Sequence, residues 1–196
     1  MFSSKYDSII ERYRGALPLA FVKAVIQYES SFNPSNRTGS YIGLMQLGPS
    51  VREDYGITEA DCLNPETNIR VGCTKLNRIV QAYGQSANMR PDWYSADYAA
   101  LVYLGYNAGS SASAGVQYVT NVLGRLGIRP TAENVYTAVI NGSAPNATSH
   151  LGNKAKIDYA NKVAYGYLGA ASPLTSPENL KYLLVLGIAG IVYWLI

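Results

Sequence analysis

The segment from 64 to 84, "NPETNIRVGCTKLNRIVQAYG", restricts the fold most, because its pattern predicts one long amphipathic helix. Asn64 is a favourable N-cap, Pro65 suits the first turn, and Gly84 marks the expected end. A helix with one apolar face must pack against other elements, so the chain needs a mainly helical core around it. The apolar positions recur at helical spacing: Ile69, Cys73, Leu76, Val80 and Tyr83.

Similar patterns extend over most of the chain. They predict further helices at 4–14, 18–31, 95–106, 114–126, 131–140 and 153–168. The glycine-rich segment 33–48 alternates only partly, which predicts a loop with a small β-hairpin. We therefore expect a predominantly α-helical domain over residues 1–170.

The end of the chain differs in composition from the rest. "ASPLTSPEN", 171–179, is typical of a linker, and 180–196 is predicted as a C-terminal hydrophobic helix. Its uncharged run, 182–196, would cover about 22 Å as a helix, less than the roughly 30 Å hydrocarbon core of a bilayer. Two interpretations follow: contact with a membrane, or an apolar helix that packs in an oligomer.

Composition excludes several classes of function. A net charge of +3 over 196 residues is too small to indicate a nucleic-acid partner. With His150 as the single histidine and two cysteines, no zinc site and no other cofactor is expected. Cys62 and Cys73 would form either a disulfide, which we favour, or two buried thiols. A nucleophilic serine or cysteine hydrolase is disfavoured, because His150 lies in a separate Asn-rich segment.

Glu29 is the strongest candidate for chemistry. It extends the apolar helical stripe of Val22, Val25 and Ile26, and no Asp or Glu follows it until Glu53. Partial burial and a position at the negative end of a helix dipole both raise the pKa of a carboxyl group, as a general acid requires. The alternative is a helix-end residue that turns to solvent.

The absence of a second acid nearby in the sequence favours a particular reaction. Most glycoside hydrolases use two carboxyl groups. A lone acid suits a route in which it protonates the leaving oxygen and then removes a proton from a hydroxyl of the same sugar. No water enters, and the product carries an internal anhydro ring.

Four segments occur in an order that is typical of one family: "ESSFNP", "GLMQL", "NPETNIRVGCTKL" and "YNAG", between residues 29 and 109. The chain resembles the lytic transglycosylase family with the SLT-type, goose-lysozyme-like domain. The resemblance implies an α+β, lysozyme-like fold that is mostly helical. It also implies cleavage of the β-1,4 bond between N-acetylmuramic acid and N-acetylglucosamine in peptidoglycan, leaving a 1,6-anhydromuramoyl end.

The resemblance also implies roles for individual residues. Glu29 matches the catalytic acid and base, and Tyr106 and Asn107 match residues that close over it, with a tyrosine hydroxyl placed to bond the carboxylate. Ser30 would orient the acid or bond its own backbone, and Met45 would line the groove or pack in the core. The remaining expected substrate contacts are Gln46 and Tyr159, the latter within "DYANKV" at 158–163.

The biological setting is an expectation of a different kind. The chain opens without an export signal, which favours a phage virion enzyme that opens the wall locally during genome entry. Its partners would be peptidoglycan glycan strands, with virion or secretion-complex proteins or a membrane engaged through 182–196. The alternative location is the bacterial envelope, where the enzyme would be anchored in the membrane. Rival functions are a hydrolytic goose-type muramidase and a non-catalytic structural component of a virion or secretion channel.

Overall fold

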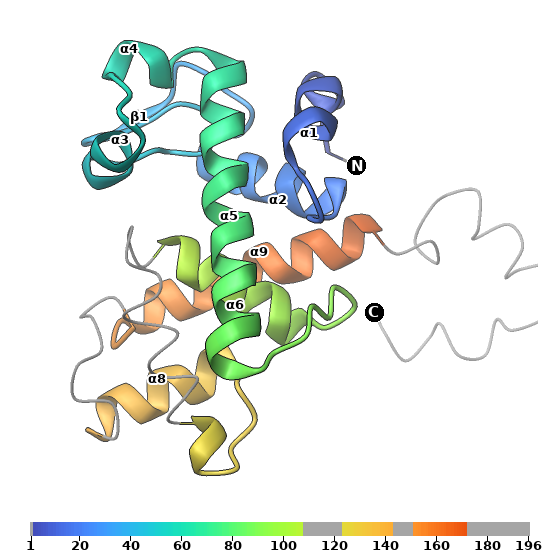
Figure 1. The fold of residues 1–196 in the computed structure, drawn as a ribbon, viewed down its shortest axis with the longest axis vertical. Helices are drawn as coiled ribbons and strands as arrows, with labels where there is room; N and C mark the ends of the chain where they lie inside the picture. The colour runs from blue at the N-terminus through green and yellow to red at the C-terminus, as the bar shows by residue number, and fades with distance from the viewer. Residues whose placement is uncertain (1, 108–122, 143–150, 172–196) are drawn as a thin grey trace, which may run out of the picture.

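A computed structural model describes residues 2–107, 123–142 and 151–171 (Figure 1). The predicted hydrophobic helix at 180–196, most of the expected helix at 114–126, and His150 lie outside these residues. Helix α9 ends at Ala171, where the predicted linker begins, and the rest of that linker also lies outside them. Within the described ranges, no helix has both the length and the apolar character needed to cross a bilayer.

The described residues form a mainly helical domain with one small sheet. The strands β1 (Arg37–Thr38) and β2 (Tyr41–Ile42) pair antiparallel, with Arg37 opposite Ile42, as the predicted hairpin requires. The helices are α1 (Asp7–Tyr13), α2 (Leu19–Ser30), α3 (Pro49–Tyr55), α4 (Glu59–Cys62), α5 (Pro65–Ala87), α6 (Ala96–Asn107), α8 (Ala132–Ile140) and α9 (Lys154–Ala171).

Two short helices between the hairpin and α5 were not predicted. Helix α3 begins at Pro49, which occupies the first turn, and ends before Gly56, whose φ is 60°. Helix α4 begins with a capping box in which Thr58 and Asp61 bond each other's backbone N–H. Both have recognisable start signals, but each is too short to show an apolar periodicity.

Helix α5 is the long central element, with the hairpin, α3 and α4 near its beginning (Figure 1). Its predicted N-cap is confirmed, since Asn64 Oδ1 accepts from the N–H groups of Glu66 and Thr67 at 2.9 and 3.1 Å. The predicted end at Gly84 is wrong. The helix continues past Gly84 and ends at Ala87, before Asn88 adopts φ 50°. The buried Tyr83 donates its hydroxyl to Leu101 O at 2.8 Å, which binds this last part of α5 to α6.

Helix α6 lies at the centre of the core. Every side chain from Tyr98 to Tyr106 is buried, because α5, α8 and α9 surround it. A helix that is apolar on all sides is expected in such a position. Helix α9 packs against both α6 and α2, so it connects the central helix to α2, whose last turn carries Glu29.

The two cysteines are free, buried thiols. The disulfide that we favoured is therefore not formed, and the alternative of two buried thiols describes them. Cys62 ends α4 and Cys73 lies within α5, each fully buried among core side chains. Burial raises the pKa of Cys73 to about 12, so this residue behaves as a small apolar side chain.

Asn68 attaches the loop after the hairpin to α5. Its Oδ1 accepts from the Met45 N–H at 2.8 Å, and its Nδ2 donates to Ile42 O and Cys62 O at 3.0 and 2.8 Å. The side chain is fully buried, so these three bonds satisfy groups that water does not reach. The loop that forms one wall of the site is thereby fixed to the longest helix of the domain.

Candidate active site

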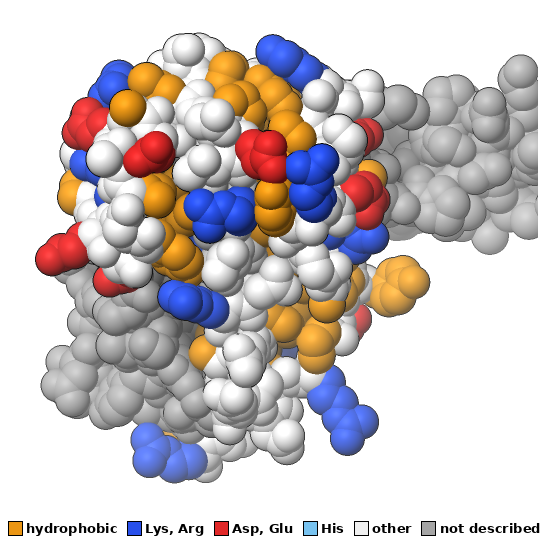
Figure 2. Space-filling model, turned by 45° about the horizontal axis from the view of Figure 1, so that its top comes forward, with side chains coloured by type: hydrophobic (Ala, Val, Ile, Leu, Met, Phe, Trp, Pro, Cys, Tyr) orange, Lys and Arg blue, Asp and Glu red, His pale blue; other side chains and the backbone are white. Residues whose placement is uncertain are grey.

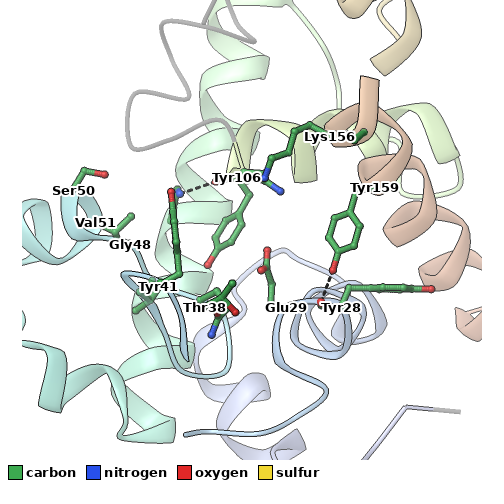
Figure 3. Close-up of a pocket in the computed structure, with 16 residues that line it drawn as sticks. Tyr28, Glu29, Thr38, Tyr41, Gly48, Ser50, Val51, Tyr106, Lys156 and Tyr159 are labelled. Carbon is green, nitrogen blue, oxygen red and sulfur yellow. Dashed lines mark hydrogen bonds between the residues drawn. The ribbon is translucent and has the colours of Figure 1, made fainter. Parts of the chain in front are cut away.

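An open cleft of about 790 Å³ lies where the end of α2, the hairpin, α5, the end of α6 and the start of α9 meet (Figure 3). Tyrosines, lysines and small residues make up most of its wall. Glu29 is the one acid among the described residues that line it. The lining residues are Tyr28, Glu29, Thr38, Gly39, Tyr41, Gln46, Leu47, Gly48, Ser50, Val51, Lys75, Tyr106, Asn107, Ala155, Lys156 and Tyr159.

Glu29 lies in the last turn of α2, and its carboxyl group points into this cleft (Figure 3). The helical offsets that link it to Val22, Val25 and Ile26 explain the placement, because those three side chains are fully buried and define the inward face. Ser31 ends the helix with φ 51°, so the chain turns away directly after the acid.

Several groups act on the pKa of Glu29. Burial is the largest influence and raises the pKa above the ordinary value for a glutamate. A hydrogen bond from Tyr103 and the charges of Lys156 and Lys75 oppose it without cancelling it. The carboxyl group therefore holds its proton to higher pH than a surface glutamate, and its charged form still has a donor and two cations nearby. Both states of an acid and base catalyst are thus supported.

The tyrosine that contacts Glu29 is not the one expected. Tyr103 donates its hydroxyl to Glu29 Oε1 at 2.6 Å, whereas Tyr106 donates to Met45 O at 2.6 Å. The expectation that a tyrosine at 106 bonds the carboxylate is therefore wrong. The sequence held a usable signal, because a residue three positions earlier on a helix shares the same face. Burial and the nearby carboxylate raise the pKa of Tyr103, so its hydroxyl remains a proton donor.

If the chain cleaves peptidoglycan, as the sequence leads us to expect, Tyr103→Phe should lower the maximal rate about tenfold, the effect of one lost hydrogen bond to a charged group. The bond stabilises the ionised carboxyl, so its loss raises the pKa of Glu29 further. The alkaline limb of a pH–rate profile should therefore move to higher pH. Tyr98→Phe is the matched control, since Tyr98 lies on the same helix and its buried hydroxyl has no partner among the described residues. An unchanged profile for the Tyr103 variant would contradict this role.

Two predicted substrate contacts lie in the interior. Ser30 is buried and donates its hydroxyl to Ile26 O at 3.1 Å, which is the backbone-bonding alternative. Met45 is fully buried, and its sulfur occupies the space beside Gly72 that a larger side chain would fill. Neither residue lines the cleft. These positions favour the alternatives of a backbone-bonding Ser30 and a core-packing Met45, and contact of either side chain with substrate stays a prediction.

The other predicted residues line the cleft. Gln46 donates from Nε2 to Gly43 O and Asn36 O at 2.8 and 3.2 Å, while its Oε1 is buried without a donor in the described part of the chain. Tyr159 donates its hydroxyl to Tyr28 O, which ties α9 to the end of α2. The structure thus brings Gln46, Tyr106, Asn107 and Tyr159 to one surface around Glu29.

Sequence reasoning missed two lysines in the cleft. Lys75, on α5, is buried and donates to Tyr106 O at 2.7 Å, with its ammonium 4.4 Å from the centre of the Tyr106 ring. Lys156, on α9, is half-buried and donates to Asn107 Oδ1 at 3.1 Å. Burial lowers the pKa of Lys75 to about 8, against the opposing charge of Glu29. No group of three His, Cys, Asp or Glu side chains placed to hold a metal occurs in the described ranges.

Comparison with known proteins identifies the family. The family model described as the transglycosylase SLT domain matches residues 8–123, more than half of the chain. The chain belongs to the transglycosylase SLT domain family. This SLT domain is also similar to the crystal structure of the 70 kDa soluble lytic transglycosylase SLT70 of Escherichia coli, with a TM-score of 0.57 and 19% sequence identity. The likeness covers 90% of this chain but 27% of that enzyme, so the SLT domain spans about a quarter of its length.

The structural likeness confirms the predicted fold class, a lysozyme-like domain that is mostly helical with a small two-stranded sheet. The residues matched by the family model include Glu29, the hairpin, Lys75 and Tyr103. Helix α9, which contributes Lys156 and Tyr159, lies beyond them. One wall of the cleft therefore comes from a part of the chain that the family model does not match.

Proposed function

We propose that this SLT domain is a peptidoglycan lytic transglycosylase that cleaves the β-1,4 bond between N-acetylmuramic acid and N-acetylglucosamine. The observation that carries the proposal is the carboxyl group of Glu29, half-buried at the wall of an open cleft with a raised pKa. Membership of the transglycosylase SLT domain family supports the reaction class. The similar Escherichia coli structure is that of a soluble lytic transglycosylase.

In the first step, protonated Glu29 donates its proton to the glycosidic oxygen. The bond from this oxygen to C1 of the muramoyl sugar breaks, and the N-acetylglucosamine side leaves as an alcohol. A glycosidic oxygen is a poor leaving group without this proton, which is why an acid with a raised pKa is required. Groups of the muramoyl sugar itself stabilise the positive charge that develops at C1.

In the second step, the newly formed Glu29 carboxylate removes the proton from the C6 hydroxyl of the same sugar. The C6 oxygen bonds to C1 and closes the 1,6-anhydro ring, so Glu29 ends in the protonated state in which it began. The Tyr103 hydroxyl, 2.6 Å from Glu29 Oε1, holds the carboxylate while it is charged. The nearby charges of Lys156 and Lys75 favour that charged state as well.

Product analysis tests the reaction directly. Purified sacculi digested with the protein should release muropeptides that end in 1,6-anhydromuramic acid, each lighter by one water than the corresponding hydrolysis product in mass spectra. Reducing ends would instead establish the hydrolytic goose-type muramidase. Intact sacculi after exposure to the folded protein would establish the non-catalytic alternative.

The setting in a phage particle remains a prediction within this proposal. There the enzyme would open the wall locally during genome entry, with the apolar run 182–196 contacting a membrane or virion proteins. The apolar composition of 182–196 supports a contact with an apolar partner, and it fits a membrane and a virion protein equally well. Detection of the protein in purified, nuclease-treated particles would support the virion, whereas its recovery in the envelope fraction of uninfected cells would support the bacterial alternative.

A further inference from the structure

The charge of the cleft differs from that of the outer surface. On the face drawn in Figure 2, basic and acidic side chains lie interspersed. Ion pairs on the surface of the described residues include Arg12 with Glu66 and Arg37 with Glu59. The described lining of the cleft instead holds two lysines and a single acid, Glu29. When Glu29 is protonated, ready to act as an acid, this lining carries only positive charge.

The two lysines differ in what they are free to bind. Lys75 is buried next to Tyr106. Its ammonium donates to the Tyr106 carbonyl oxygen and lies against the face of the Tyr106 ring. That carbonyl belongs to the last turn of α6, where a cation favourably offsets the helix dipole. Lys75 therefore stabilises the end of α6 in the wall of the cleft, and its ammonium is not free to bind a ligand.

Lys156 has the opposite character. It extends from α9 over the cleft toward Glu29 (Figure 3). It bonds the neutral side-chain oxygen of Asn107, and no ion pair within 4.0 Å involves it in the described part of the chain. Glu29 offsets its charge only when the carboxyl group is ionised, so beside protonated Glu29 the ammonium has no counter-charge. A half-buried ammonium with unused donors beside the reacting group is suited to bind an anionic oxygen of a ligand.

We propose that Lys156 binds a carboxylate carried on the lactyl side of the muramoyl sugar, so that the cleft selects an anionic glycan over a neutral one. The inference rests on the proposed function, because it places the muramoyl sugar beside Glu29. The carboxylate has two sources of the same chemistry: the lactyl group itself in a glycan without peptide, or the peptide stem attached to it. A chitin-type glycan offers neither and gains nothing from Lys156.

Binding should be measured with Glu29→Gln protein, so that affinity is separated from cleavage. In that background, Lys156→Met should weaken binding of soluble peptidoglycan strands about tenfold, as expected for one lost charge-assisted hydrogen bond. Lys156→Arg should retain most of the affinity. Lys162→Met is the matched control, because it removes the same charge from an exposed position on α9 outside the lining of the cleft.

Chemical neutralisation of the ligand gives an independent arm. Strands whose carboxylates are capped as amides should bind the Glu29→Gln protein with Lys156 intact only weakly. Their affinity should be about that of native strands for the protein that also carries Lys156→Met. The substitution should cost no further affinity for the capped strands. Strands stripped of peptide by an amidase, which frees the lactyl carboxylate, distinguish the sources. A retained effect of Lys156 means that the lactyl carboxylate also binds Lys156 once the stem is gone, and a lost effect restricts the binding to the stem.

Two outcomes would overturn the proposal. One is equal affinity of Lys156→Met and Lys162→Met for native strands. The other combines two results. Lys156→Met leaves the affinity for strands unchanged in the Glu29→Gln protein, and it moves the alkaline limb of the cleavage rate to higher pH when Glu29 is present. Together these would mean that Lys156 acts only on the pKa of Glu29. Failure of the proposed function would look different, because wild-type protein would leave sacculi intact whatever its affinity for strands.

Discussion

Replacing Glu29 with Gln is expected to reduce the clearing of purified sacculi at least about a thousandfold, within the range that general acid catalysis contributes. The amide keeps the size of the side chain but has no proton of suitable acidity to donate and cannot accept one in the second step. Clearing should be followed by turbidity, with released muropeptides counted by mass spectrometry. Glu53→Gln on α3 is the matched control, because it makes the same change at an exposed site outside the lining of the cleft.

The same substitution has an expected effect on stability. The pKa of Glu29 is higher in the folded chain than in an exposed glutamate, so the folded state binds a proton more tightly than the unfolded state. Stability is therefore lost as the pH rises from the ordinary glutamate pKa through the raised one. Because Gln carries no charge to desolvate, Glu29→Gln should be at least as stable as wild type at neutral pH. Clearing at the wild-type rate by this folded variant would refute the proposed chemistry.

Much of the scaffold follows from local signals in the sequence. The cap of α5 and the apolar stripe that directs Glu29 inward both depend on residues within a few positions of each other. Such contacts can be inferred because helix geometry fixes them. The position of Glu29 at the wall of the cleft is therefore the part of the site that the sequence predicts best.

Contacts between distant segments could not be inferred in this way. The predicted stripe of α5 describes one of its faces, but Asn68, Gly72, Lys75 and Ile79 form a second helical face that is also buried. The polar members of this second face break the apolar pattern, so periodicity assigns them to solvent. Their burial depends on the hairpin loop and α6, which other parts of the chain supply.

The choice between Tyr103 and Tyr106 shows the same limit at the site. Both lie on one face of α6, three positions apart, with their rings stacked at 6.3 Å between centres. Their hydroxyl partners, Glu29 and Met45, lie more than fifty residues earlier in the chain. A motif that includes Tyr106 marks the correct turn of the helix, but which hydroxyl meets the acid depends on how α9 brings α6 and α2 together, since α9 packs against both helices.

Gly43→Ala is expected to destabilise the domain by at least about 3 kcal/mol, and with it the loop that carries Gln46. Gly43 has φ 84°, where L side chains are strained, and a Cβ there would overlap both the backbone oxygen of Cys62 and the side-chain amide of Asn68. The overlap cannot be relieved by a side-chain rotation alone, because Asn68 is held by its bonds to Ile42 and Met45. Denaturant unfolding followed by circular dichroism measures the loss.

Gly39→Ala separates the two causes of that loss. Gly39 lies in the turn of the hairpin just before this loop, with φ 60°, but no atom lies within 4 Å of the place where its Cβ would be. Its substitution should therefore cost only the backbone strain, about 1–2 kcal/mol. Equal destabilisation by the two variants would mean that Asn68 and the Cys62 carbonyl yield without cost. A markedly larger loss at Gly43 would establish that the close approach of the loop to α5, made possible by a missing side chain, holds one wall of the cleft in place.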